Sequence, residues 1–395
     1  MPHNNKIYFL VVYFIAFLIT YHSALPLYIN SSFLGTFLPE SAIGFVYALS
    51  AALVILLLII FPKILARFGN YKTILALILL EAGSLILLSL QFPALISIAV
   101  FIFIQVWLAL LGFNLDIFLE RFSDNKTTGR VRGLFLATMS FAVLLGPLST
   151  SFILSNGDYQ KIYLISALFL IPVFFIIAQR LRGFQDPQYR IIPYAAILKG
   201  VFLARHPKDE VRHATFAGLL LRFFYSWMVI YTPLYLNIYM GFTWSEIGII
   251  LTIMLIPFVL FEAPIGRLAD TSFGEKKIMM IGFCIMAFFT GTLFFITNAS
   301  ILLWAALLFG TRVGASFVEV ASESYFFKHI ESKDTEVLSV FRNSQLLASI
   351  VAPFFASLLL LFTDMKYLFP ALALIMLLGI WVSGNTRPAR NNENK

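Results

Sequence analysis

Twelve runs of mostly apolar residues, each of membrane-spanning length, dominate this chain of 395 residues. A helix of about 20 apolar residues crosses the hydrocarbon core of a bilayer, so each run is expected to be a transmembrane helix. Hydrophobic residues make up 60% of the chain and charged residues only 12%, about half the charged share of a soluble domain. We therefore expect an all-α integral membrane protein of twelve helices. The runs lie near residues 8–29, 43–62, 73–92, 95–118, 134–154, 162–179, 214–236, 246–265, 278–297, 300–324, 337–362 and 367–384.

The loop charges predict the orientation. If each run crosses the membrane, 24 of the 28 Lys and Arg residues fall on one side and two, Lys161 and Lys366, on the other. Basic residues accumulate in cytoplasmic loops, so both termini are expected in the cytoplasm, with the chain in the plasma (inner) membrane. The same bias explains the net charge of +8 without a nucleic-acid partner. The first run is too long for a secretory signal peptide and is expected to be retained.

Five features recur in the same order along the chain. They predict an N-terminal half (1–180), a central linker (181–213), a C-terminal half (214–386) and a tail (387–395), with the halves related by a parallel pseudo-two-fold repeat. The apolar stretch 191–202 inside the linker is either a helix on the inner membrane surface or an ordinary connection. At offsets of 203 to 207 residues, the recurring features are Pro26-Leu27-Tyr28 with Pro233-Leu234-Tyr235, Ile43-Gly44 with Ile247-Gly248, Gly69 with Gly274, Asp116 and Glu120 with Glu319 and Glu323, and Pro147 with Pro353.

The loop after the eighth run carries the most specific motif. It reads Gly266-Arg267-Leu268-Ala269-Asp270, then Thr271-Ser272-Phe273-Gly274-Glu275-Lys276-Lys277. This resembles the signature loop of the major facilitator superfamily, which implies a twelve-helix secondary transporter. By the same resemblance, Arg267, Asp270 and Lys277 belong to a cytoplasmic charge network that latches one conformation, with Gly266 and Gly274 as the motif glycines. The loop departs from the family pattern by one extra residue before Gly274 and by Glu275 in place of a basic residue.

The first-half loop keeps less of this motif. Arg67 and Gly69 stand at matching places, and both are candidates for the latch, but Ala66 occupies the position of the Asp. Gly146-Pro147 in the fifth run is similar to a motif of drug–proton antiporters, yet the glycine pair that follows it in that group is absent. We therefore assign no subfamily.

Four charged residues inside the runs are candidates for transport or coupling, because an ionisable side chain within a membrane is costly and commonly functional. Asp116 and Glu319 are repeat mates. Arg312 shares a helical stripe with Ser316, Glu319 and Glu323, and it is expected to face a cavity or to pair with an acid. Arg222 either pairs with an acid of the tenth run or binds an anionic substrate.

Three further acids, Glu120, Glu262 and Glu323, lie near the inner ends of their runs. They are expected to act in the latch or to extend toward water at the membrane surface. Glu81 stands alone in the third run and is expected to be protonated and packed. His22, near the outer end of the first run, is expected to be an interfacial histidine rather than a proton switch.

The chain has neither a phosphate-binding loop nor a His/Cys metal-ligand cluster nor a nucleophile–base motif, and its only cysteine is Cys284. We therefore expect no enzyme activity, cofactor or metal. The function expected is secondary active transport of a small solute by a monomer through alternating access, as a symporter or antiporter driven by a proton or solute gradient, with the substrate cavity between the halves. One alternative is a receptor or assembly protein that keeps the transporter fold. Another is a membrane enzyme that acts on lipid-linked substrates, although the very short outer loops argue against it.

Overall fold

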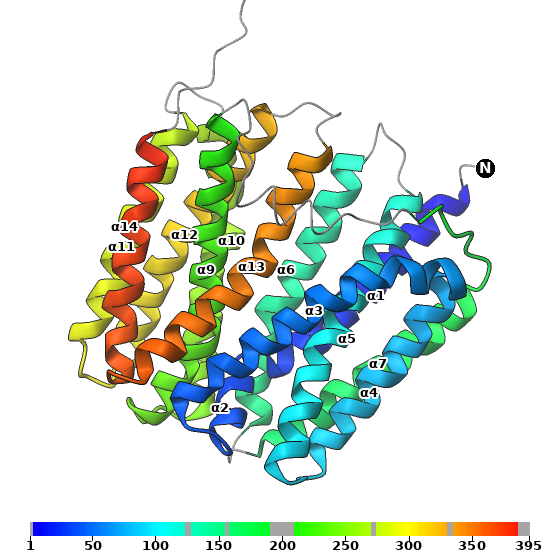
Figure 1. Cartoon of the computed structure of the whole chain (residues 1–395), viewed down its shortest axis with the longest axis horizontal. Coiled ribbons are helices and arrows are strands. Elements are labelled where there is room, and N and C mark those ends of the chain that lie inside the picture. The colour runs from blue at the N-terminus through cyan, green and yellow to red at the C-terminus, as the bar shows by residue number, and fades with distance from the viewer. Residues whose placement is uncertain are drawn as a thin grey trace, which may run out of the picture. The chain divides into compact units, whose positions relative to one another are not determined.

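The computed structural model describes residues 3–122, 128–154, 158–189, 209–269, 274–329 and 335–385. Within these ranges all regular secondary structure is helical (Figure 1), which confirms the predicted all-α class. The predicted linker stretch 191–202 lies outside the described residues. The helices are α1 (His3–Leu27), α2 (Asn30–Gly35), α3 (Glu40–Phe68), α4 (Asn70–Ser89), α5 (Ala94–Phe122), α6 (Thr128–Ile153), α7 (Tyr159–Arg180), α9 (Asp209–Ile238), α10 (Trp244–Ala269), α11 (Glu275–Thr292), α12 (Ile301–His329), α13 (Thr335–Leu360) and α14 (Leu368–Gly384), with two 3-10 turns, η1 (Leu293–Phe295) and η2 (Met365–Tyr367).

Eleven of the described helices are long and apolar enough to cross a membrane, and they coincide with eleven of the twelve predicted runs. The remaining run, near 337–362, forms α13, whose apolar part is Leu346–Leu360. The count of twelve therefore stays a prediction at this helix. The short helix α2 was not expected from the hydropathy pattern, because its Asn30, Ser31 and Ser32 are polar although they are buried.

Two glycines give the repeat a structural counterpart. Gly69 and Gly274 have φ angles of 78° and 75°, and they form the N-caps of α4 and α11. Side chains with a Cβ rarely adopt this region of backbone space, so both positions require glycine. The two loops that precede the third helix of each predicted half therefore end in the same backbone conformation.

The chain forms two compact units. Unit 1 contains Met1–Pro39, Leu49–Ile192 and Thr243–Gly248, and unit 2 contains Glu40–Ala48, Pro193–Phe242 and Ile249–Lys395. By their contacts, the first residues of α3 thus belong to unit 2 and the first residues of α10 to unit 1.

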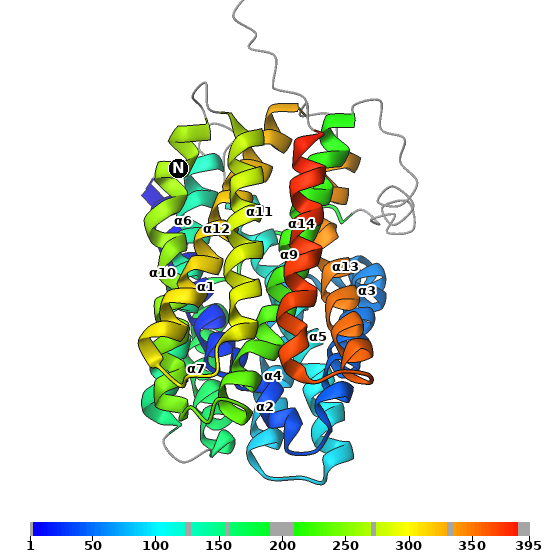
Figure 2. The same ribbon diagram turned by 90° about the vertical axis from the view of Figure 1, so that its left-hand side faces the viewer.

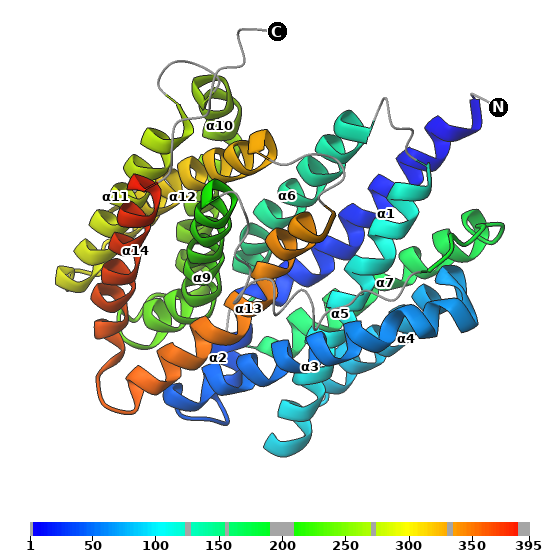
Figure 3. The same ribbon diagram turned by 45° about the horizontal axis from the view of Figure 1, so that its top comes forward.

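In unit 1, α1 packs against α6 and α7, while α4 packs against α7 and α5 (Figure 3). Hydrogen bonds of side chains join α1 to α6. The hydroxyls of Tyr21 and Ser149 lie 2.6 Å apart, and the Thr150 hydroxyl donates to the Leu25 carbonyl at 2.7 Å. Polar contacts of this kind are common between transmembrane helices, where apolar burial provides little net attraction.

In unit 2, α11 packs along both α12 and α14, and α9 packs against α13 and α12 (Figure 2). The backbones of α11 and α12 come close together at Gly282 and Gly314. A Cβ added at either glycine would lie 2.8 Å or less from the carbonyl oxygen of the other. Small residues let two helix backbones meet in this way, and the contact fixes the position of α12 within the unit.

Gly44 and Gly248 are related by the repeat and lie in the first turns of α3 and α10. Each lets its helix approach another helix that contains a proline. In unit 2, a Cβ at Gly44 would collide with the carbonyl oxygen of Pro353 and lie 2.6 Å from the Ser357 hydroxyl. In unit 1, a Cβ at Gly248 would lie 2.6 Å from the Pro147 carbonyl oxygen. Two repeat-related glycines thus contact two repeat-related prolines.

Candidate functional site

The charged stripe predicted on the tenth run lies on α12 of unit 2. Opposite it, α9 presents Arg222 and Tyr225, which are three residues apart and so share one helix face. The contact between α9 and α12 brings the two faces together. This arrangement places two residues of a different helix beside the stripe.

Glu319 is the centre of the cluster. One of its carboxylate oxygens lies 3.1 Å from Nη2 of Arg222, and the other accepts a hydrogen bond of 2.8 Å from the Tyr225 hydroxyl. Arg222 also lies 3.7 Å from the Glu323 carboxylate. Of the two roles considered for Arg222, the structure therefore supports pairing with the acids of α12.

Arg312 is 2% exposed in the interior of unit 2. Its guanidinium carbon lies 5.2 Å from the ring centre of Phe224 and 5.3 Å from that of Tyr225. Aromatic faces attract cations, and the attraction is larger where water is excluded. Tyr225 thus contacts both Arg312 and Glu319, a bridging role that the sequence argument missed, although its spacing from Arg222 could have indicated it.

A third carboxyl group belongs to this environment. Glu262 of α10 is exposed, and it interacts electrostatically with Glu319 and Glu323. Among the side chains that the structure describes, three carboxyl groups thus accompany two guanidinium groups. With all five ionised these groups sum to one negative charge, which a single proton neutralises.

The other coupling candidate lies elsewhere. Asp116 is exposed on α5 in unit 1, whereas its repeat mate Glu319 is half-buried on α12 in unit 2. Glu120 belongs to α5, but its side chain is not among those described. The repeat-related acids are therefore not structural equivalents in their surroundings.

The start of α4 is capped by a residue that the sequence argument overlooked. Asp186, which follows α7, accepts a hydrogen bond of 2.7 Å from the Asn70 backbone amide and another from the Tyr189 hydroxyl. Carboxylates favour helix N-termini, where backbone amides lack partners within the helix. The first-half loop has Ala66 where the family motif has Asp, and a carboxylate distant in sequence lies at this loop instead. Arg67, in contrast, is exposed and lies over the Phe68 ring.

We expect Asp186→Ala to destabilise unit 1 by about 1 kcal/mol, the typical loss when a helix cap is removed. The thermal midpoint of the purified protein, measured by tryptophan fluorescence, should fall. Gln188→Ala, an exposed substitution in the same segment, is the matched control. Equal midpoints for both variants would contradict a capping role for Asp186.

The start of α11 has a different arrangement. Glu275, in the first turn, lies 2.5 Å from the Lys328 amine and accepts a hydrogen bond of 3.3 Å from Ser324, both on α12. The departure noted at Glu275 thus provides an ion pair between α11 and α12. Asp270 lies outside the described residues. Arg267, Lys277, Glu262 and Glu323 are exposed, while Gly266 and Gly274 lie at intermediate depth.

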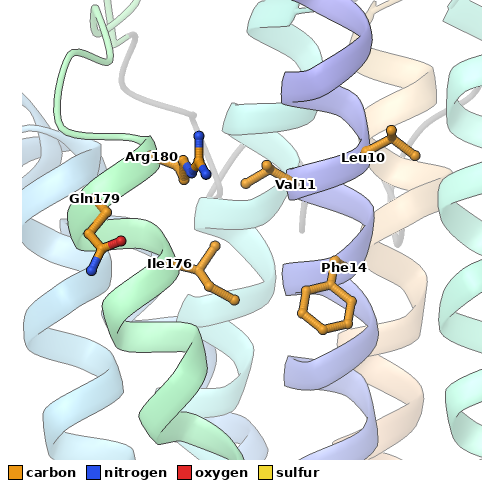
Figure 4. A pocket seen from close by; sticks show the side chains of 6 residues that line it. All are labelled: Leu10, Val11, Phe14, Ile176, Gln179 and Arg180. Carbon is orange, nitrogen blue, oxygen red and sulfur yellow. The ribbon is translucent and has the colours of Figure 1, made fainter.

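A groove of about 410 Å³ lies between α1 and α7 in unit 1 (Figure 4). Its lining includes Val11, Phe14, Ile176 and Arg180, and none of the predicted coupling residues. This groove is therefore not the candidate site. No group of three or more potential metal ligands occurs among the described residues.

Comparison with known proteins agrees with this architecture. The sequence profile described as Major Facilitator Superfamily matches residues 9–246 and 214–395. A comparison with curated protein sequences gives no match.

Solved transporter structures share the fold. A bacterial homologue of the human lysosomal transporter Spinster, inward-facing and unoccupied, superposes with a TM-score of 0.71 at 12% identity, covering 97% of this chain and 94% of that chain. A point mutant of the nucleoside transporter NupG gives 0.76 at 13% identity, covering 96% and 99%. The POT family transporter PepTSo gives 0.75 at 12%, covering 95% and 97%. At such identities the similarity concerns the fold alone.

Proposed function

Because the chain belongs to the Major Facilitator Superfamily and is a multi-pass secondary transporter, we propose that a proton drives it and that Glu319 is the coupling residue. The observation that supports this most directly is the surplus of one carboxyl group in the cluster around Glu319. Glu319 is the least exposed of the three acids, and ionisation within a membrane is costly, so a proton bound at this cluster lowers that cost.

The contacts suggest how protonation changes the structure. When Glu319 is ionised, it holds Arg222 and Tyr225 of α9 against α12. When Glu319 takes a proton, the ion pair with Arg222 is lost and the charge-assisted hydrogen bonds weaken. Protonation thus loosens one contact between two helices of unit 2. A ligand or proton shifts a conformational equilibrium only through such a difference in interaction between states.

The protein works as a monomer in the plasma membrane with both termini in the cytoplasm, and it carries a small solute together with or against protons. The loop charges support this orientation. A receptor or assembly role on the same fold, and an enzyme on lipid-linked substrates, predict no movement of solute across a sealed bilayer.

One experiment in two steps tests the proposal. Purified protein is first screened by thermal shift against a broad solute library at two pH values. A stabilising solute is then followed into proteoliposomes with an imposed pH gradient. We expect uptake above equilibrium that a protonophore abolishes. Uptake that is insensitive to the protonophore and follows only an opposing solute gradient would contradict proton drive.

The signature loop provides a separate prediction. We expect Asp270→Asn to loosen the proposed latch, because an amide binds Arg267 or a helix amide less strongly than a carboxylate does. Ile265 is 3% exposed on the last part of α10, so a cysteine placed there, with Cys284 replaced by serine, should react faster with a thiol reagent in the Asn variant. Asp270→Glu, which keeps the charge, is the control. Identical labelling rates in all three proteins would exclude this role.

A further inference from the structure

A second pair of ionisable residues lies deep in unit 1, separate from the cluster around Glu319. His22 of α1 is 0% exposed and Glu81 of α4 is 1% exposed. His22 Nε2 lies 3.4 Å from a Glu81 carboxylate oxygen. The two residues are 59 positions apart. His22 was expected at the membrane interface and Glu81 alone in its helix, but both are buried and lie side by side.

The pair is enclosed by groups that do not neutralise it. Ser166 of α7 donates to the His22 backbone carbonyl at 2.6 Å, so this hydrogen bond does not involve the imidazole. His22 Nδ1 and the second Glu81 oxygen are both buried and have no hydrogen-bond partner among the described residues. Buried polar atoms nearly always have partners, and exceptions call for an explanation.

The charged and titratable groups of the surrounding helices have other partners or lie apart. On α7, Tyr163 donates to Asn30 at 2.9 Å, and Lys161 is exposed beside Asp158. On α5, Asp116 lies toward the opposite end of its span. On α6, the described side chains that bond to α1 are the uncharged hydroxyls of Ser149 and Thr150, which contact Tyr21 and the Leu25 carbonyl. No described ion pair joins a third charged group to His22 and Glu81.

The charge of the pair depends on its proton count. When the imidazole is neutral and the carboxyl group is ionised, the pair carries one negative charge. With one proton the pair is neutral overall, whether the proton resides on the carboxyl or forms an imidazolium. A second proton makes it positive. Burial of both side chains disfavours either net charge, so the pair holds one proton while it is enclosed and changes its proton count only when the structure admits water to it.

We propose that His22 and Glu81 form a proton-binding site in which one shared proton is shielded from water. His22 lies five residues before the end of α1 at Leu27, about 7.5 Å along the helix axis. Exchange of the proton therefore requires a rearrangement that admits water to this level. The two atoms without partners, Nδ1 of His22 and one oxygen of Glu81, then become available to bind that water. This site does not depend on coupling at Glu319.

The test measures the proton directly, without a transported solute. Full-length protein in lipid nanodiscs is titrated with acid and followed by infrared difference spectroscopy with 13C-labelled glutamate. We expect a protonated-carboxyl band that changes with pH and is lost in Glu81→Gln. His22→Gln should shift the band, because it removes the imidazole partner. Asp158→Asn, which alters a partly exposed carboxylate of the same unit, should leave it unchanged.

Further variants separate the outcomes. Glu319→Gln should keep the band, so failure of the coupling proposal does not affect this result. Glu81→Asp keeps a carboxyl group at a different frequency, and a displaced band assigns the signal even if Glu81→Gln does not fold. A Glu81 band that stays constant throughout the titration, or no band sensitive to Glu81, would overturn the proposal. Either result would make the pair a fixed structural contact.

Discussion

Replacing Glu319 by Gln is expected to abolish proton-driven accumulation of solute while leaving the protein folded. The substitution keeps the side-chain size and a hydrogen-bond acceptor for Tyr225, but it removes the negative charge that holds Arg222. The cluster then lacks its surplus carboxyl group. In proteoliposomes, the pH gradient should no longer drive uptake above equilibrium, whereas exchange of labelled solute at equal pH should persist.

Two companion variants make this result interpretable. Glu323→Gln removes the more distant acid, whose side chain is 48% exposed, and should reduce coupling less than Glu319→Gln. Arg222→Gln combined with Glu319→Gln removes both partners of the ion pair, so that no guanidinium is left without its acid. Gradient-driven accumulation at the wild-type level in Glu319→Gln would exclude Glu319 as the coupling residue.

An alanine at Gly44 is expected to disrupt the contact between the start of α3 and α13. The added Cβ would collide with the backbone oxygen of Pro353, which cannot move aside as a flexible side chain can. Overpacking of this kind costs about 1–3 kcal/mol. We expect a lower thermal midpoint and faster thiol labelling of a cysteine at Ala352, which is fully buried in unit 2, with Cys284 replaced by serine.

The repeat offers a second test of the same contact and a matched control. Gly248→Ala should have a comparable effect on the midpoint, since its Cβ would meet Pro147 and Ser151. Gly112→Ala is the control, because no atom lies within 4 Å of the added Cβ and alanine is favoured over glycine inside a helix. If Gly44→Ala and Gly248→Ala match Gly112→Ala in stability and labelling, the helix contacts are not as tight as described.

The features predicted best from sequence were those that depend on local properties. The helical class and eleven of the spans follow from runs of apolar residues, because a bilayer requires each span to satisfy its own backbone hydrogen bonds. The matching glycines at 69 and 274 share one backbone conformation for the same local reason. The family resemblance at 266–277 agrees with the profile match over the chain.

The partners of individual charged groups could not be predicted in this way. Glu319 was expected to be a possible partner of Arg312 on its own helix, but its described ion pair is with Arg222 of α9. Helix periodicity predicts which residues share a face, and it leaves open which face of another helix lies opposite. Asp186 was missed because a cap supplied from 116 residues away leaves no pattern in the loop that it caps.

The sequence by itself thus determined that this protein is a membrane-embedded helical repeat, since hydropathy, loop charge and internal similarity are properties of short segments. Only the tertiary structure decided which charges meet. The cluster around Glu319 and the buried pair of His22 and Glu81 each join helices far apart in the chain. Such pairs form because an isolated charge is costly within a membrane, and packing determines which partner is within reach.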